Sequence, residues 1–276
     1  MKLSDTNIKE FARYLCREEK SAATQEKYVR DAQAFRVYAQ NDEITKELVV
    51  AWKKMLVQSG YAVRSVNSML ASVNSLLEFL GLSNCKVKNI RSQRQTYCTE
   101  DQELTKAEYM RLLAASRNNE QLNLVIQTIC GTGIRVSELR YFTLEAICCG
   151  EVTVDCKNKT RTILVPGKLK NILMNYAKRH GITAGPVFVT RTGKPLNRSN
   201  IWSAMKKLCQ HANVKPSKVF PHNLRKLFAR TFYGIEKDIA KLADILGHSN
   251  INTTRIYIMT TSSEHRRKME RLGLII

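Results

Sequence analysis

The sequence predicts a mainly α-helical protein with one small β-sheet insertion, built as two domains. Three observations carry this prediction. Apolar residues recur at helical spacing through residues 6–80, a polar stretch without period follows, and a short alternating β pattern interrupts the helices of the second half. We therefore expect a helical domain at residues 1–86, a linker at 87–103 and a larger domain at 104–276.

Four apolar stripes in the first domain each have the spacing of one helix face. They comprise Ile8, Phe11, Ala12 and Leu15; Tyr28, Ala32 and Phe35; Leu48, Val49, Trp52 and Met55; and Val66, Leu70, Val73, Leu76, Leu77 and Leu80. Gly81 follows the last stripe as a stop signal. Such stripes are typical of the packed core of a small helical bundle, and they argue against a cofactor pocket.

Residues 87–103 are polar and lack any period, which is typical of an interdomain linker. Basic side chains at its start suit a strap along a phosphate backbone. They are Lys86, Lys88, Arg91 and Arg94. The alternative is a linker whose charges only face solvent. Both halves of the chain carry more basic than acidic residues, which favours two domains that clamp DNA between them.

The second domain opens with a capping box, because Thr105 precedes Glu108 by three residues before an apolar run. Residues 151–155 alternate and residues 161–165 are rich in β-branched side chains, so we expect a β-hairpin with its turn between them. Residues 187–190 are a candidate third strand. Helices then resume and continue to the end.

The composition indicates a nucleic-acid partner. The chain of 276 residues has 45 Lys and Arg against 24 Asp and Glu, a formal net charge of +21. An excess of this size attracts polyanions over long distances, and DNA or RNA is the commonest of these. A membrane is a poorer candidate, since the sequence has no long apolar run. Asp5 and Glu10 also fall where a secretion signal needs an apolar stretch.

The sequence gives no sign of a metal site or a bound cofactor. Its eight cysteines form no CxxC pair and no zinc spacing with histidine, so we expect free thiols in a reducing cytoplasm. No Walker A motif and no acidic metal cluster is evident either.

Three short segments of the second domain contain residues that suit phosphate chemistry. The first, GTGIRVSEL, is a glycine turn that places Arg135 at a helix start with Glu138 one turn later. Taken alone, this arginine is better explained by a surface salt bridge with Glu138.

The second and third segments add two histidines, an arginine and a tyrosine. His222 and Arg225 are three residues apart and share one helix face, where they could grip one phosphate. In the segment LGHSN, Gly247 ends a helix just before His248, and a short helix then carries Tyr257. Alone, the HxxR spacing is common by chance, and such a tyrosine is more often an ordinary core or surface aromatic.

In combination and in this order, the segments resemble the boxes of the tyrosine recombinase, or phage integrase, family. The boxes read GTGIRVSEL, HNLRKLFA and LGHSNINTTRIY. The resemblance covers residues 105–260, and the N-terminal bundle is similar to the family's SAM-like core-binding domain. It implies an enzyme, a site-specific DNA recombinase, whose two domains form a C-shaped clamp on DNA.

The resemblance implies roles for five residues. Tyr257 is similar to the nucleophile that attacks the scissile phosphate and leaves a 3′-phosphotyrosine. Arg135 and Arg225 resemble the pair that stabilises the transition state, and His222 resembles the group that handles the proton. His248 resembles the hydrogen-bond donor to the phosphate.

Two further roles follow from the resemblance. Glu138 matches an acidic residue that orients Arg135 or packs the site. The family's general acid is a lysine in a β-hairpin, for which the loop here offers Lys157 and Lys159. The loop differs in length from the commonest family pattern, so the choice stays open, with Lys157 preferred.

The chemistry agrees with these residue types. Guanidinium groups stabilise the charge that gathers on a phosphodiester in transfer, as metal ions do elsewhere. The covalent intermediate keeps the energy of the phosphodiester bond, so rejoining requires neither ATP nor a metal ion. We therefore expect no cofactor.

Three other functions compete with this interpretation. A type IB topoisomerase shares the phosphotyrosine chemistry, but the box that ends in Tyr257 favours a recombinase. A DNA-binding regulator without activity would not need the complete set of arginines, histidines and tyrosine. A metal-dependent transposase or nuclease would need clustered carboxylates, which the sequence lacks.

The resemblance also implies an assembly. Exchange between two duplexes needs two cleavages in each, so we expect a homotetramer on two specific sites in double-stranded DNA. Free protein is expected as a monomer or weak dimer. The tail ends in Leu272, Leu274, Ile275 and Ile276. We expect it to dock on a neighbouring protomer, and folding back onto its own domain is the alternative.

The helical bundle begins near residue 6, which resembles simple two-domain recombinases of the Xer type. These include chromosome-dimer resolvases, mobile-element integrases and inversion enzymes. The target site, the order of strand exchange and any accessory proteins stay open. We expect the protein in the bacterial cytoplasm, at the nucleoid.

Overall fold

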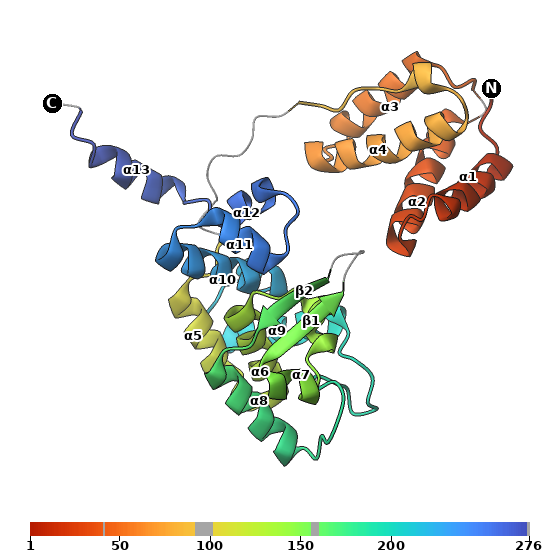
Figure 1. The fold of residues 1–276 in the computed structure, drawn as a ribbon. Helices are drawn as coiled ribbons and strands as arrows, with labels where there is room; N and C mark the ends of the chain where they lie inside the picture. Colours follow the sequence, from red (N-terminus) through yellow and green to blue (C-terminus); the bar gives the residue numbers. More distant parts are fainter. Residues whose placement is uncertain (41, 92–101, 156–159, 275–276) are drawn as a thin grey trace. The chain divides into compact units, whose positions relative to one another are not determined.

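The chain folds into two compact units, Met1–Arg94 and Gln95–Ile276. The computed structural model describes residues 1–40, 42–91, 102–155 and 160–274 (Figure 1). Helices dominate both units and the second unit contains one small sheet, so the predicted fold class is confirmed.

The first unit is a bundle of four α-helices. They are α1 (Asp5–Arg17), α2 (Ala22–Ala39), α3 (Lys46–Gln58) and α4 (Val63–Phe79), followed by the 3-10 turn η1 (Ser83–Cys85). Ser4 and Thr45 cap α1 and α3 by accepting backbone N–H groups with their hydroxyl oxygens. The predicted stripes meet in one core, where Trp52 packs edge-on against Phe35 at a ring-centroid distance of 5.1 Å.

The chain stays attached to this bundle beyond α4. Asn74 Oδ1 accepts the N–H of Val87 at 3.0 Å, and Asn67 exchanges two hydrogen bonds with the backbone of Ile90. The first residues of the expected linker therefore pack on the first unit. Residues 92–101 of that linker, Arg94 included, lie outside the described residues.

The second unit contains the remaining elements. They are α5 (Lys106–Ala115), α6 (Glu120–Thr132), η3 (Val136–Tyr141), α7 (Leu144–Cys149), β1 (Glu151–Asp155), β2 (Thr160–Leu164), α8 (Gly167–Arg179), α9 (Arg198–His211), η4 (Pro216–Lys218), α10 (Pro221–Glu236), α11 (Ile239–Leu246), α12 (Ile251–Tyr257) and α13 (Ser262–Glu270). Helices α6 and α10 pack against each other, and α11 packs on α12. The predicted capping box at Thr105 and Glu108 is present at the start of α5.

The predicted β-hairpin is confirmed by strands β1 and β2. They pair antiparallel, from Glu151 opposite Leu164 to Asp155 opposite Thr160. The side chains of Val152, Val154 and Ile163 point into the core.

The candidate third strand at residues 187–190 is wrong, because in the described chain this segment makes only an isolated bridge, Val189 to Pro195. The backbone of this segment bonds to two different parts of the chain. Val187 N–H donates to the carbonyl of Phe142, whereas Thr190 N–H donates to the carbonyl of Lys194. The segment therefore has no single partner along which a ladder could extend.

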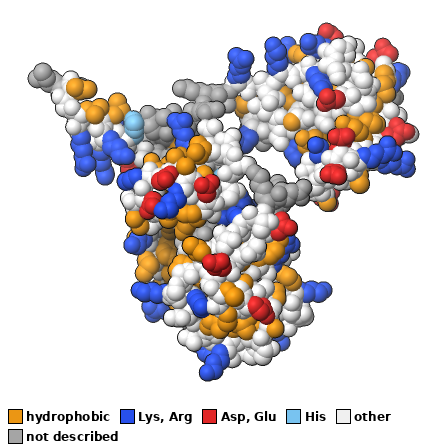
Figure 2. Space-filling model, in the orientation of Figure 1, with side chains coloured by type: hydrophobic (Ala, Val, Ile, Leu, Met, Phe, Trp, Pro, Cys, Tyr) orange, Lys and Arg blue, Asp and Glu red, His pale blue; other side chains and the backbone are white. Residues whose placement is uncertain are grey.

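The C-terminal helix α13 buries none of its side chains. Lys and Arg side chains gather along it (Figure 2), and Leu272 and Leu274 beyond it are 63% and 83% exposed. None of the helices in the described parts of the chain is long and apolar enough to cross a membrane.

Candidate active site

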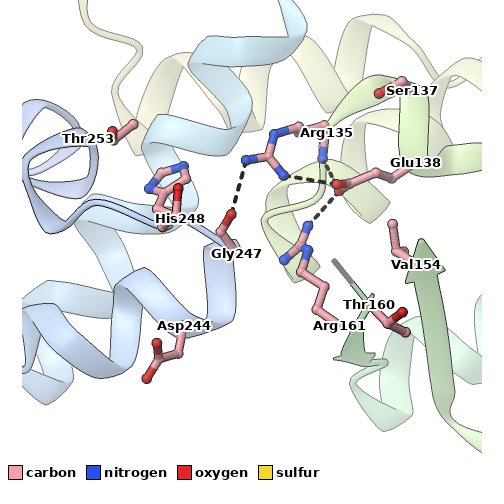
Figure 3. A pocket seen from close by; sticks show the side chains of 11 residues that line it. Arg135, Ser137, Glu138, Val154, Thr160, Arg161, Asp244, Gly247, His248 and Thr253 are labelled. Carbon is pink, nitrogen blue, oxygen red and sulfur yellow. Dashed lines mark hydrogen bonds and ion pairs between the residues drawn. The ribbon is translucent and has the colours of Figure 1, made fainter. Parts of the chain in front are cut away.

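Arg135 stands directly after α6, at the start of η3. Helix α6 ends at Gly133, whose φ of 65° lies in the left-handed region. A Cβ atom there would lie 2.4 Å from Phe228 Cδ1, so both backbone and packing require glycine. Arg135 lines a hollow of about 810 Å³ together with Arg161, Gly247 and other residues (Figure 3).

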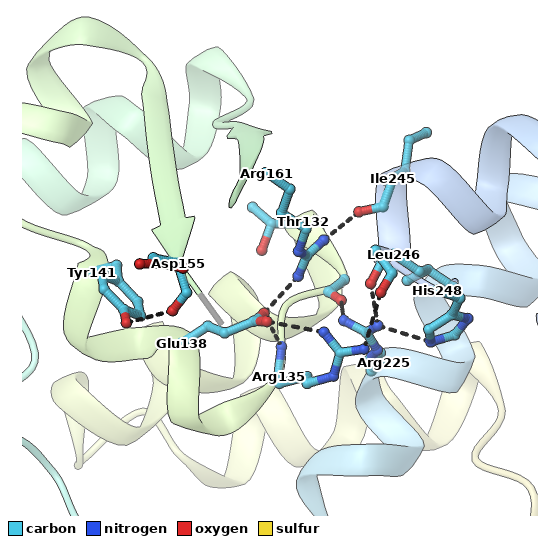
Figure 4. Close-up of polar contacts among 12 residues, drawn as sticks. Thr132, Arg135, Glu138, Tyr141, Asp155, Arg161, Arg225, Ile245, Leu246 and His248 are labelled. Carbon is cyan, nitrogen blue, oxygen red and sulfur yellow. Dashed lines mark hydrogen bonds and ion pairs between the residues drawn. The ribbon is translucent and has the colours of Figure 1, made fainter. Parts of the chain in front are cut away.

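Glu138 is the buried acid of this site, with 1% of its surface exposed. Its Oε2 accepts the backbone N–H of Arg135 at 2.7 Å, and its Oε1 accepts from Arg135 Nη1 at 3.0 Å. Arg161 Nη2 donates to the same carboxylate at 2.6 Å (Figure 4). The ion pair expected between Arg135 and Glu138 is therefore present, and one carboxylate serves two arginines.

Arg161 on β2 was not among the predicted site residues. Its side chain is 14% exposed, and its Nη1 donates to the carbonyl of Ile245 at the end of α11. The alternation of side chains along the strand could have indicated its importance. It puts Arg161 on the same face as the buried Ile163 and Val165. A charged residue on an inward face needs a partner, and here it has two.

Arg225 lies in the first turns of α10 and is 1% exposed. Its Nη1 donates to the carbonyl of Gly133, and its Nη2 donates to the carbonyl of Leu246 at 2.6 Å. Its Nε has no partner in the described chain. Burial, followed by the charge of Arg135, lowers the pKa of Arg225 to about 10, so the group is still a cation at neutral pH.

His248 sits in the turn after α11 with both ring nitrogens engaged. Nε2 lies 3.0 Å from Arg225 Nη2 and Nδ1 lies 2.9 Å from Thr254 Oγ1. Arginine can only donate, so Nε2 accepts and the ring proton is on Nδ1. Burial, followed by Arg225 and Arg135, lowers the pKa of His248 to about 4. In this arrangement the ring is neutral and accepts a hydrogen bond from Arg225.

Tyr257 is the last residue of α12 and is 7% exposed. The rings of His222 and His248 each meet its ring edge-on, at centroid distances of 5.0 Å. Burial, followed by the charges of Lys226 and Arg225, holds the pKa of His222 below its ordinary value. The tyrosine is thus held between two neutral histidines.

A second hollow, of about 330 Å³, has Tyr257, His222 and Arg225 in its wall. It shares Arg135 and Ser137 with the larger hollow. The exposed Trp202 of α9 lines it too.

Six predicted site residues therefore meet in one place, although they come from three separate segments. They are Arg135, Glu138, His222, Arg225, His248 and Tyr257. Lys157 and Lys159 lie outside the described residues, between Asp155 and Thr160. Thr160, at the start of β2, lines the larger hollow.

The predicted DNA-contacting residues belong to the other unit. Lys88 and Arg91 are exposed, whereas Lys86 pairs with Glu78 at 3.1 Å. No group of three or more His, Cys, Asp or Glu side chains in the described ranges could hold a metal ion, and the expectation of metal-free chemistry stays a prediction.

Comparison with known proteins identifies the family. The model of the phage integrase family matches residues 102–264, and that of the phage integrase N-terminal SAM-like domain matches residues 8–83. The chain belongs to the phage integrase family. The resemblance inferred from the three boxes is thereby confirmed, and with it an enzyme of site-specific DNA recombination.

Similar proteins match along nearly the whole chain. Tyrosine recombinase XerA of Pyrococcus furiosus is 29% identical over 97% of this chain and 94% of its own length. A crystal structure of XerA recombinase has a TM-score of 0.55 at 22% identity and covers 99% of both chains.

Two lambda integrase structures also have this fold. The dimer bound to a COC′ core site matches with a TM-score of 0.73 at 16% identity, over 94% of this chain and 95% of that one. The tetramer bound to a Holliday junction has the same TM-score and identity, over 91% and 76%.

Proposed function

We propose that this enzyme cuts and rejoins DNA at a specific site through a covalent 3′-phosphotyrosine at Tyr257. The observation that carries the proposal is the meeting of Arg135, Arg225, His222 and His248 around that tyrosine. These residues come from three segments that are far apart in sequence, and together they supply the cations and proton acceptors that phosphodiester transfer needs.

Each residue has a place in the reaction. The Tyr257 oxygen attacks phosphorus and loses its proton, which His222 can accept because that imidazole is neutral. Arg135 and Arg225 bind the non-bridging oxygens of the phosphate, where negative charge increases. The bond to the 5′-oxygen breaks, and Lys157 or Lys159 protonates that oxygen. Attack by a 5′-hydroxyl on the phosphotyrosine reverses the steps and rejoins the strand.

His248 would change partners when DNA binds. Its Nε2 now accepts from Arg225. Once a phosphate takes that guanidinium, Nε2 is free, and the anion favours a proton on it. His248 would then donate to the phosphate, as the family resemblance implies.

The nucleophile is tested with Tyr257→Phe on a nicked suicide substrate that carries the cognate site. The variant should bind DNA with unchanged affinity and form no covalent adduct on a denaturing gel. Tyr233→Phe is the matched control, because Tyr233 is half-buried and packs in the same cluster. An undiminished adduct with Tyr257→Phe would place the nucleophile elsewhere.

We propose further that four protomers act on two DNA sites, with the two units of each protomer closing on the duplex as a clamp. Lambda integrase forms a tetramer on a Holliday junction, which supports this stoichiometry by analogy. Lys88 and Arg91 would contact phosphates, together with Arg94 and, once free of Glu78, Lys86. The cytoplasm, where chromosomal DNA lies, would be the place of action.

The C-terminal tail would join the protomers. Helix α13 buries no side chain, and Leu272 and Leu274 are exposed, as expected of a segment that docks on a neighbour. Deletion of residues 272–276 should leave binding to a single site nearly intact and abolish recombination. Gel-shift titrations on one and two sites, with a recombination assay, measure both effects. Full recombination by the truncated protein, or loss of monomer folding, would contradict docking on a neighbour.

A further inference from the structure

The end of helix α11 collects three arginines from three separate segments. The carbonyl of Ile245 accepts from Arg161, that of Leu246 from Arg225, and that of Gly247 from Arg135 at 3.4 Å (Figure 4). The last carbonyls of a helix lack partners within the helix and carry its partial negative charge. Three successive carbonyls at the C-terminal end of α11, the last from its capping residue Gly247, therefore bind the three arginines of the site.

Arg161 differs from the other two in its place at the site. Arg135 and Arg225 line the hollow that contains Tyr257, whereas Arg161 lines the larger hollow and not that one. Both of its terminal nitrogens bind protein groups. Nη1 binds the carbonyl of Ile245, and Nη2 binds Glu138 Oε2 at 2.6 Å. The other oxygen of Glu138 holds Arg135. Arg161 thus connects strand β2 to both the end of α11 and the carboxylate that orients Arg135 (Figure 4).

The stem of Arg161 also packs on the turn before His248. A Cβ atom on Gly247 would lie 2.6 Å from Arg161 Cδ and 2.9 Å from its Nε. Gly247 has a φ of 63°, which glycine adopts without strain. Two features of this position, its backbone angle and the arginine above it, therefore exclude a side chain.

We infer that Arg161 is a positioning residue for phosphate binding, an inference that rests on the proposed function. It holds Glu138 and the end of α11 in register, and through them sets Arg135, Arg225 and His248. It acts through these groups because its Nη1 and Nη2 bind the carbonyl of Ile245 and Glu138, and its side chain does not line the hollow that contains Tyr257. Its loss should therefore weaken the compensation of phosphate charge and leave proton transfer to the leaving group unaffected.

The test compares Arg161→Gln with wild type on two suicide substrates. One has an ordinary phosphodiester at the scissile position, and the other has a methylphosphonate, in which a methyl group replaces one non-bridging oxygen and removes the charge. Misplaced arginines should slow phosphodiester cleavage by roughly a hundredfold, and the methylphosphonate should be cut within about threefold of the wild-type rate on that substrate. Arg135→Ala should behave in the same way. Arg179→Gln, which alters an exposed pair with Glu120, should leave both rates unchanged.

Arg161→Lys separates position from charge. A lysine keeps the positive charge beside Glu138 but cannot bind two acceptors with a planar fork, so cleavage of the phosphodiester should stay about tenfold slow. Thermal unfolding of each variant shows whether it folds.

Equal slowing of Arg161→Gln on both substrates, or wild-type cleavage by Arg161→Lys, would overturn the inference. Wild-type protein that forms its adduct at a residue other than Tyr257 would instead overturn the proposed function, whatever the Arg161 variants do.

Discussion

The two units of this protein bury charge in opposite ways. In the first unit Asp31, 4% exposed, pairs with Lys27 at 2.7 Å and with the exposed Arg30 at 3.5 Å, and it accepts from Ser72 at 2.9 Å. In the second unit Arg135 and Arg161 share the single carboxylate of Glu138, and Arg225 has no ion pair among the described residues.

This difference indicates that the charged groups of the two units have different roles, in packing in the first unit and in binding an anion in the second. In the first unit the partly buried Lys27 has its charge balanced by Asp31. The second partner of Asp31, Arg30, is 75% exposed, so solvent screens its charge. This arrangement is complete within the protein. In the second unit three guanidinium groups lie near a single carboxylate. Burial of Arg225, followed by the charge of Arg135, lowers the pKa of Arg225 to about 10, so repulsion between the arginines contributes to this shift. We expect such an excess of positive charge to bind an anion, and in the proposed reaction that anion is the scissile phosphate.

The largest effect is expected when an arginine of the second unit is replaced, because these residues carry the excess of positive charge. Arg135→Ala and Arg225→Ala should each slow cleavage by roughly a hundredfold or more, the effect of removing one charge-stabilising donor. Arg→Lys at either position should also be poor, because lysine cannot make the bidentate contact. Single-turnover cleavage of the suicide substrate measures these rates, with Arg179→Ala as control.

The same excess of positive charge leads us to expect that wild-type cleavage persists in EDTA. Loss of cleavage on chelation, restored by magnesium, would mean that the arginines do not stabilise the phosphate on their own.

A second test separates charge from proton delivery in the hairpin. Lys157→Ala should slow cleavage by about a hundredfold, the contribution of a general acid. A 5′-bridging phosphorothiolate should restore the rate, because a thiolate leaves without a proton. Lys159→Ala should need little rescue. The reverse pattern would assign the role of general acid to Lys159. If the phosphorothiolate rescued neither variant, neither lysine would be the general acid.

The smallest effect is expected in the first unit. Asp31→Asn should lower the stability of the bundle by about 2 kcal/mol, because Lys27 loses its partner in a partly buried place. Cleavage at saturating protein should not change. Urea unfolding followed by the fluorescence of Trp52, in a Trp202→Phe background, reports this unit alone.

Asp5→Asn is the matched control for Asp31→Asn. Asp5 pairs with Arg36 with 63% of its side chain exposed, and its loss should cost less than about 0.5 kcal/mol. Equal effects at the two positions would mean that burial does not distinguish them.

The elements with a strong local signal were predictable from the sequence. The helix stripes of the bundle, the capping box at Thr105 and the hairpin at 151–165 depend on neighbours a few residues away, and the structure contains all three. The residues that meet in the site followed from the family resemblance, since no local pattern relates Arg135 to Tyr257 across more than a hundred residues.

The remaining features depend on contacts that spacing does not encode. Residues 187–190 have the composition of a strand, but their backbone groups bond to two different segments, so no continuous ladder forms. The sequence predicts that Val87 and Ile90 belong to the linker, because their own neighbours show no period. The side chains that hold them to the bundle, Asn74 and Asn67, are on α4, and spacing does not reveal these contacts. The sequence does not single out Arg161, because it is one charged residue in a β-branched segment. Its role depends on its partners, Glu138 and the carbonyl of Ile245, and these come from distant parts of the chain.

The burial of Tyr257 bears on how safely such an enzyme handles a chromosome. A DNA strand joined to protein is a broken strand, and hydrolysis of that ester would leave the break permanent. The tyrosine lies between two histidine rings with 7% of its surface exposed, so bulk water has little access to the side chain. A tethered 5′-hydroxyl held beside the ester has a large advantage in effective concentration over the few waters that can enter. We therefore expect the packing around Tyr257 to limit hydrolysis of the phosphotyrosine ester, so that the strand is rejoined and not left broken.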